Sequence, residues 1–270
     1  MDHRPIGVFD SGLGGLTTVR ELLRLLPEED IIYFGDTARV PYGSRSPETI
    51  LKFARQDMNF LCSFDLKAVV IACGTVSTTS LSALQQEYSL PIIGVVEPTA
   101  VAAARRTRNG RIGLIATAAS IHSGAYERVI ARENPKATVF GKACPLFVPL
   151  VENGRFRPGD TVVETVAEEY LQSMKEAGVD TLILGCTHYP LLSDVIGQIM
   201  GPEVALINAG REAACALKNL LTERNALAEG GHGDTSYYVS DTVDGFEHMA
   251  GLFLRSDLKG MVQQINIEKY

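Results

Sequence analysis

The sequence lacks several features that would assign it to a common functional class. Its five cysteines form no CxxC pair, which argues against a zinc ribbon or a thioredoxin-type centre. It has no apolar run near membrane-spanning length, and residues 1–10 lack the charged-then-apolar pattern of a signal peptide. With a net charge of −7, it also lacks the basic excess typical of nucleic-acid surfaces. We therefore expect a cytoplasmic protein with reduced thiols and without membrane or nucleic-acid partners.

Long linkers and low-complexity segments are missing as well, although 270 residues are enough for two domains. Hydrophobic residues make up 46% of the chain, so it can bury a substantial core. Short apolar runs alternate with helix-like segments, which predicts an α/β fold of parallel sheets with helices on both faces. Helices are expected over residues 76–87, 158–177 and 189–200, and a loop over the proline-containing stretch 144–154.

One stretch, TLILGCTHYPLL at residues 181–192, combines a strand pattern with reactive side chains. Its apolar part is followed by a glycine and then by Cys186, Thr187 and His188. A proline two residues later is compatible with the first turn of a helix. The pattern predicts a buried parallel strand that places a thiol, a hydroxyl and an imidazole where open α/β sheets bind ligands.

A second stretch has the same arrangement, because the apolar residues 68–72 are followed by Cys73, Gly74 and Thr75. A helix N-terminus lowers a thiol pKa below its usual value of about 8.5, so we expect thiolates near neutral pH. One thiol beside one histidine favours acyl transfer. Two matched thiols instead suggest two bases facing one carbon. The residues alone leave both interpretations open.

The other cysteines and the histidine have simpler interpretations. Cys62, Cys144 and Cys215 are interpreted as small buried apolar residues. His188 is either a core imidazole or a group that polarises the adjacent thiol or the substrate. Because Cys186 and His188 are the only close Cys/His pair, we expect no metal site.

A glycine-rich turn, DSGLGG at residues 10–15, follows the first predicted strand. Such turns expose backbone N–H groups that bind phosphate or carboxylate. No Gly-Lys-Ser/Thr follows, and Thr17 replaces the third glycine of the dinucleotide-binding pattern, so neither nucleotide motif is complete. We expect the carboxylate of Asp10 to lie beside this anion pocket rather than within it.

Three further positions each have two interpretations. Thr117 and Ser120 begin a predicted helix, either as a plain N-cap or as carboxylate ligands. Glu152 is either a solvated loop acid or an acid near the second cysteine. Tyr42 and Gly43 form either an ordinary turn or part of a site.

Taken together, these motifs resemble the cofactor-independent glutamate racemases. The resemblance is carried by DSGLGG at 10–15, GDTARVPYG at 35–43, ACGT at 72–75, the segment 117–120 and LGCTHYPLL at 184–192. It extends from the first strand to about residue 210.

The resemblance implies two similar flavodoxin-like α/β domains with parallel sheets and an active site in the cleft between them. Residues 1–97 and 208–270 would form the first domain and residues 98–207 the second. The family interconverts L- and D-glutamate without pyridoxal phosphate or metal and supplies D-glutamate for peptidoglycan. It commonly forms homodimers.

The family's site residues carry over by position. Cys73 would take the α-proton from D-glutamate with the help of Asp10. Cys186 would take it from L-glutamate with the help of His188 and Glu152. The substrate would be held by Ser11, Tyr42, Gly43, Gly74, Thr75, Thr117 and Thr187.

Two positions depart from the family pattern. Gly74 stands where the family usually has asparagine, and Asn208 stands where many relatives carry an acid. These changes concern substrate detail rather than reaction type, so a racemase of aspartate or hydantoins is an alternative. A cysteine hydrolase using Cys186 and His188 is another, as is a two-lobed binding protein without catalytic activity.

Overall fold

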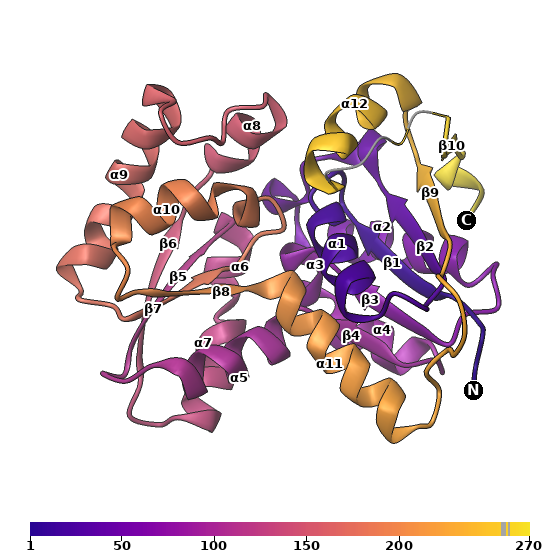
Figure 1. The fold of residues 1–270 in the computed structure, drawn as a ribbon, viewed down its shortest axis with the longest axis horizontal. Coiled ribbons are helices and arrows are strands. Elements are labelled where there is room, and N and C mark those ends of the chain that lie inside the picture. Colours follow the sequence, from indigo (N-terminus) through magenta and orange to yellow (C-terminus); the bar gives the residue numbers. More distant parts are fainter. Residues whose placement is uncertain (255–257, 259) are drawn as a thin grey trace.

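The computed structural model describes residues 1–254, 258 and 260–270 and contains two parallel sheets (Figure 1). The six-stranded sheet has the order β10-β9-β2-β1-β3-β4, and the four-stranded sheet has the order β6-β5-β7-β8. The first sheet consists of β1 (Ile6–Asp10), β2 (Ile31–Gly35), β3 (Ala68–Ile71), β4 (Ile92–Gly94), β9 (Thr235–Val239) and β10 (Val262–Gln264). The second consists of β5 (Arg111–Ala116), β6 (Thr138–Ala143), β7 (Thr181–Leu184) and β8 (Ala205–Asn208). This confirms the predicted α/β class with two parallel sheets.

Helices cover both faces of each sheet. Around the first sheet lie α1 (Leu16–Leu25), α2 (Pro47–Leu61), α3 (Gly74–Thr79), α4 (Leu81–Glu87), α11 (Ala209–Glu223) and α12 (Val243–Leu254). Around the second lie α5 (Val96–Arg106), α6 (Ala118–Ser123), α7 (Ala125–Glu133), α8 (Phe147–Glu152), α9 (Thr161–Glu176) and α10 (Ser193–Met200). Short 3-10 turns are η1 (Thr37–Arg39), η2 (Tyr42–Ser44), η3 (Tyr189–Leu192) and η4 (Ile267–Lys269).

The central strands are buried on both faces, which explains their continuous apolar sequences. Every residue of β1 and β3 is buried. Along β1 the side chains alternate, so Val8 belongs to the core beneath α1 and Phe9 to the core beneath α2. In the described residues, no helix is both long and apolar enough to cross a membrane.

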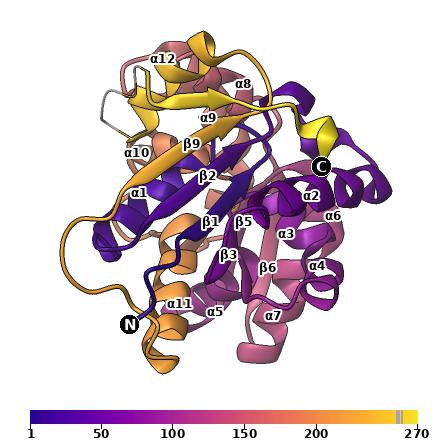
Figure 2. The ribbon, with the colours of Figure 1, turned by 90° about the vertical axis from the view of Figure 1, so that its right-hand side faces the viewer.

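The chain passes between the sheets twice. Helix α5 leads from β4 to β5, and α11 leads from β8 back toward β9; the two helices pack against each other. Figure 2 shows β9 beside β2, so the segment after α11 completes the sheet that the first strands began.

Several predicted boundaries were wrong for identifiable local reasons. The helix predicted over 76–87 is interrupted at Ser80, because the hydroxyls of Thr78 and Thr79 donate to the backbone carbonyl of Thr75. The helix after Thr117 is interrupted at Gly124, which adopts a left-handed conformation with φ of 61°.

Other segments differ in type or extent. The stretch predicted as a loop contains α8, in which Pro149 occupies the first turn, where a missing N–H costs nothing. The helix predicted to start at residue 158 begins at Thr161, after Asp160 caps it through the backbone N–H of Val162. Residues 189–192 form a 3-10 turn before α10, and β10 was not predicted.

Candidate active site

A cavity of about 360 Å³ lies at the carboxyl ends of the strands, between the two sheets. It is lined from the first sheet's side by the residues after β1 and β3, and from the second's by those after β5 and β7. Of the residues considered for the site in the sequence, Asp10 and Ser120 do not line it. The sequence motifs therefore converge on one cavity that both Cys73 and Cys186 line.

Cys73 stands at the N-cap of α3, immediately beyond β3, and is buried. Its thiol donates a long hydrogen bond of 3.7 Å to Ser11 Oγ. Burial, together with the negative charge of Asp10, raises the pKa of Cys73 to about 12. The expectation of a lowered pKa was therefore wrong for this thiol, because desolvation raises the pKa more than the N-terminus of the short helix α3 lowers it.

Asp10 occupies the glycine-rich turn itself. Its Oδ2 atom accepts hydrogen bonds from the backbone N–H groups of Gly12 at 3.1 Å and Gly15 at 2.9 Å. The prediction that Asp10 lies beside the anion pocket was wrong, since its own carboxylate fills the N–H cradle. Burial raises the pKa of Asp10, while the charge of His188 and these N–H bonds oppose the rise.

Cys186 follows β7 and has an imidazole as its partner. Its Sγ lies 3.9 Å from His188 Nδ1, and His188 Nε2 lies 3.0 Å from Glu152 Oε1. Burial lowers the pKa of His188, but its hydrogen bonds to Cys186 and Glu152 outweigh burial and raise that pKa to about 10. A thiol, an imidazolium and a carboxylate thus form a chain on this side of the cavity.

The two sides of the cavity touch directly. The hydroxyls of Thr75 and Thr117 are 3.1 Å apart, and Thr187 Oγ1 lies 3.5 Å from Asp10 Oδ1. A Cβ atom on Gly43 would lie 3.2 Å from that of Thr117. These contacts bring the predicted substrate-holding residues of both sheets within one small volume.

The glycine at position 74 has a geometric basis. A Cβ atom there would lie 2.7 Å from the carbonyl oxygen of Gly185, which real Cβ atoms essentially never do. The residues flanking the two cysteines are therefore in backbone contact, and a side chain at position 74 would push them apart.

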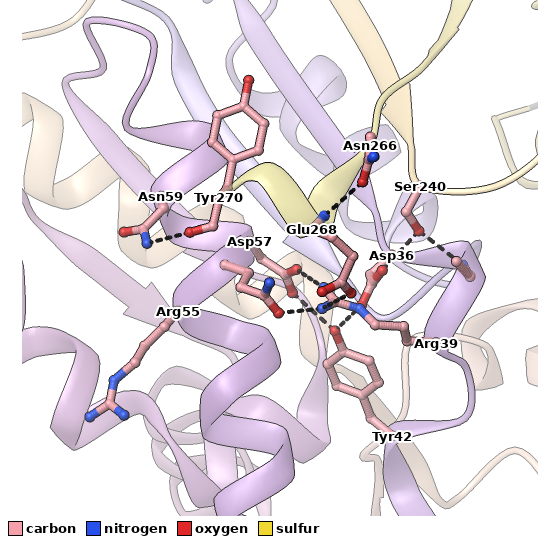
Figure 3. Close-up of polar contacts among 12 residues, drawn as sticks. Asp36, Arg39, Tyr42, Arg55, Asp57, Asn59, Ser240, Asn266, Glu268 and Tyr270 are labelled. Carbon is pink, nitrogen blue, oxygen red and sulfur yellow. Dashed lines mark hydrogen bonds and ion pairs between the residues drawn. The ribbon is translucent and has the colours of Figure 1, made fainter.

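Tyr42 lines the cavity, and its hydroxyl is bound by buried carboxylates. Its hydroxyl donates to Asp36 and, at 3.2 Å, to Asp57 (Figure 3). Arg39 pairs with the same carboxylates at 2.6 Å and 3.1 Å. This buried cluster anchors η2, which begins with Tyr42 and Gly43, so the turn offers the cavity its backbone rather than the phenol.

Sequence reasoning gave no role to the acids and the arginine of this cluster. Asp36 and Arg39 lie within the motif at 35–43, but Asp57 comes from the middle of α2. Burial, and then the charge of Asp36, raises the pKa of Asp57 well above its usual range. An acid among apolar helix residues was the signal that could have identified Asp57.

The remaining cysteines differ from one another. Cys144 is buried and lines the cavity, and burial raises its pKa to about 12. Cys215 is half-buried in α11. Cys62 is exposed, contrary to its predicted burial, because α2 ends at Leu61 and leaves Cys62 at its C-cap. In the described parts of the chain, no three His, Cys, Asp or Glu residues are grouped to hold a metal ion.

Two parallel α/β sheets that meet at one cavity are the architecture of a known racemase family. The Asp/Glu/Hydantoin racemase family matches residues 6–217, and the chain belongs to this family. It is 47% identical to the glutamate racemase of Geobacter metallireducens, across 99% of this chain and 98% of that protein.

Solved structures agree with this placement among the glutamate racemases. The glutamate racemase isoform of Bacillus anthracis superimposes with a TM-score of 0.93 at 39% identity, covering 98% of both chains. The glutamate racemase of Francisella tularensis, solved in complex with D-glutamate, has a TM-score of 0.91 at 38% identity over 100% of both chains.

Proposed function

We propose that this glutamate racemase interconverts L- and D-glutamate by two-base proton transfer between Cys73 and Cys186. The observation that carries the proposal is the placement of the two thiols, which enter one cavity from different sheets. Two bases on opposite sides of an α-carbon invert it without turning the substrate. The product, D-glutamate, serves peptidoglycan synthesis.

In the proposed reaction, one thiolate takes the α-proton and the thiol opposite donates its proton to the other face of the carbanion. Each turnover therefore exchanges the protonation states of Cys73 and Cys186, and the reverse reaction restores them. His188, held by Glu152, exchanges protons with Cys186. Asp10 acts on both sides of the cavity, because its charge raises the pKa of Cys73 and its Oδ1 atom lies 3.5 Å from Thr187 Oγ1.

The carbanion needs strong stabilisation, because an amino-acid α-proton is far less acidic than a thiol. Preorganised donors around the α-carboxylate supply it. We assign this role to the hydroxyls and backbone of the remaining predicted residues. They are Ser11, Tyr42, Gly43, Gly74, Thr75, Thr117 and Thr187.

We also propose that the chain is divided into two domains. We assign residues 1–97 and 208–270 to one domain and 98–207 to the other, because α5 and α11 carry the chain between the sheets. We further propose a cytoplasmic homodimer, as the resemblance implies. Light scattering on the purified protein measures the oligomer, and a monomer at micromolar concentration would contradict it.

The test is α-proton exchange in deuterated buffer. Purified protein free of pyridoxal phosphate should abolish the optical rotation of L-glutamate while deuterium appears at Cα. Cys73→Ser and Cys186→Ser should each reduce this activity by roughly 10²–10⁴-fold. The same assay with aspartate tests the alternative substrate. If aspartate loses its optical rotation and glutamate does not, aspartate replaces glutamate as the proposed substrate.

A cysteine hydrolase is a second candidate, favoured by the chain of Cys186, His188 and Glu152. It requires no second thiol. Cys73→Ser therefore separates the two functions, since a hydrolase keeps its activity in this variant and the two-base racemase loses it.

A further inference from the structure

The first turn of α1 contains a buried hydroxyl that the proposed reaction does not use. Thr17 is 1% exposed, and its Oγ1 lies 2.9 Å from the carbonyl oxygen of Gly14 and 2.7 Å from that of Thr187. The first acceptor belongs to the same turn. The second belongs to the segment after β7, on the other side of the cavity, so the hydroxyl hydrogen bridges the two halves of the molecule.

The Thr187 carbonyl and the His188 N–H belong to one planar peptide group. Holding that carbonyl therefore also holds the direction in which the chain enters His188. The imidazole needs such control, because its Nδ1 faces Cys186 at 3.9 Å while its Nε2 faces Glu152 at 3.0 Å.

The glycine-rich turn at residues 10–15 packs closely against the segment that contains Thr187 and His188. A Cβ atom on Gly14 would overlap Thr187 Oγ1 and would lie 2.5 Å from His188 Nδ1. Only a glycine lets the segment lie this close to the turn. Gly14 thus makes room for the segment, and Thr17 supplies the hydrogen bond that fixes it there.

We propose that Thr17 is a positioning residue, which orients the Cys186–His188 segment from the opposite half of the molecule. The proposal rests on the two-thiol function above. It predicts an effect confined to one thiol, because Cys73 follows β3 and does not belong to the segment that Thr17 holds.

The experiment compares Thr17→Val and Thr17→Ser with Thr18→Val. Valine keeps the shape of threonine and removes the donor, whereas serine keeps the donor. Thr18 is the matched control, since it is also fully buried in α1 and its hydroxyl has no hydrogen-bond partner within the described chain. Thr18→Val should leave the racemisation rate unchanged.

Thr17→Val should lower kcat/KM by about 5- to 100-fold, the effect of leaving a buried acceptor without its donor. Thr17→Ser should recover most of that rate. Because the two enantiomers have equal free energy, kcat/KM falls equally in both directions, so the rates alone do not locate the damaged step.

Primary deuterium isotope effects on kcat/KM do locate it. With α-deuterated L-glutamate, the label leaves in the transfer to Cys186, so the isotope effect should rise in Thr17→Val. With α-deuterated D-glutamate, the label leaves in the transfer to Cys73, so the isotope effect should fall. A smaller folded fraction would change neither.

The outcomes separate the two proposals. If the wild type racemises glutamate and Thr17→Val behaves like Thr18→Val, the role of Thr17 is wrong and the racemase function stands. Equal changes of both isotope effects would also overturn it. If the wild type exchanges no α-proton, both proposals fail together.

Discussion

The two sides of the cavity begin from the same sequence pattern and end in different proton chemistry. Each thiol follows a buried strand, but the residue two positions later is Thr75 after Cys73 and His188 after Cys186. On the second side the imidazole gives the thiol a partner for its proton. On the first side burial and the negative charge of Asp10 both make the thiol harder to ionise.

Both thiols are buried at strand ends, so the difference between the two sides lies in the ionisable group beside each thiol. The pKa of about 12 keeps Cys73 protonated at neutral pH. Forming its thiolate requires added positive charge, which the ammonium group of a bound amino acid brings into the cavity. The Cys186 side has a cation of its own, because the pKa of His188 is about 10.

The largest effect should come from removing that cation. His188→Asn should lower kcat/KM by roughly 10²–10⁴-fold, because a positioned acid–base group is lost. The isotope effect with α-deuterated L-glutamate should rise and that with D-glutamate should fall. His122→Asn is the control, since His122 is exposed at the end of α6. If the two isotope effects changed equally in His188→Asn, the two sides of the cavity would be equivalent in proton transfer.

Next in size is the contact that joins the two sides. Gly74→Ala should lower kcat by about 10²-fold, because its Cβ would displace the carbonyl of Gly185 and shift the reacting groups by a fraction of an ångström or more. Gly197→Ala is the control, since a Cβ there meets only Leu206 at 3.9 Å. Unchanged kinetics in Gly74→Ala would show that the contact does not set the spacing of the sides.

A smaller effect should follow from the cluster beneath the first side. Tyr42→Phe should lower the free energy of unfolding by about 1–3 kcal/mol, because buried Asp36 and Asp57 lose a donor. Urea denaturation measures it, with the half-buried Tyr88→Phe as control. A large rise in KM without any loss of stability would instead place the phenol on the substrate.

The charge on His188 should also appear in the pH dependence of stability. Its pKa rises from 6.5 to about 10 on folding, so the folded state holds a proton that the unfolded chain releases above pH 6.5. Stability should therefore fall as pH rises through this range, by at most about 1.4 kcal/mol per pH unit from this group. Unfolding between pH 7 and 9 should show a shallower decline in His188→Asn; parallel declines would contradict the raised pKa.

The smallest effect concerns the exposed thiol. Cys62 should react with iodoacetamide before Cys73 does, because Cys62 is exposed and Cys73 is buried and protonated. Peptide mass spectrometry follows the labelling, and activity should persist while Cys62 alone is modified. Cys62→Ser should remove the first labelling phase. Parallel loss of activity would place Cys62 near the reaction.

Sequence patterns predicted the parts of this molecule that depend on local order. The strand-to-thiol junctions were found because a buried parallel strand is a continuous apolar run, and the residues after it reach the same sheet edge. The role of Glu152 was ambiguous, because Pro149 suggested a loop. The residue instead ends the short helix α8, which places its carboxylate against His188.

The wrong helix boundaries have local causes, whereas two features of the site depend on residues far apart in the sequence. The raised pKa of Cys73 depends on burial and on Asp10, which is far from it in the sequence. The bond between Thr17 and Thr187 joins residues 170 positions apart, and no motif signals it. Burial and distant partners are set by the fold, so a pattern along the chain does not contain them.

The strand order of the first sheet has a consequence for biosynthesis. Strand β9 pairs with β2, from Ile31 with Thr235 to Gly35 with Val239, although the whole second sheet lies between them in the sequence. During translation, the edge of β2 therefore stays unpaired until the ribosome has released the whole second sheet and then β9. The first sheet to be begun is therefore the last to be completed, and until then the edge of β2 can pair with a strand of another chain.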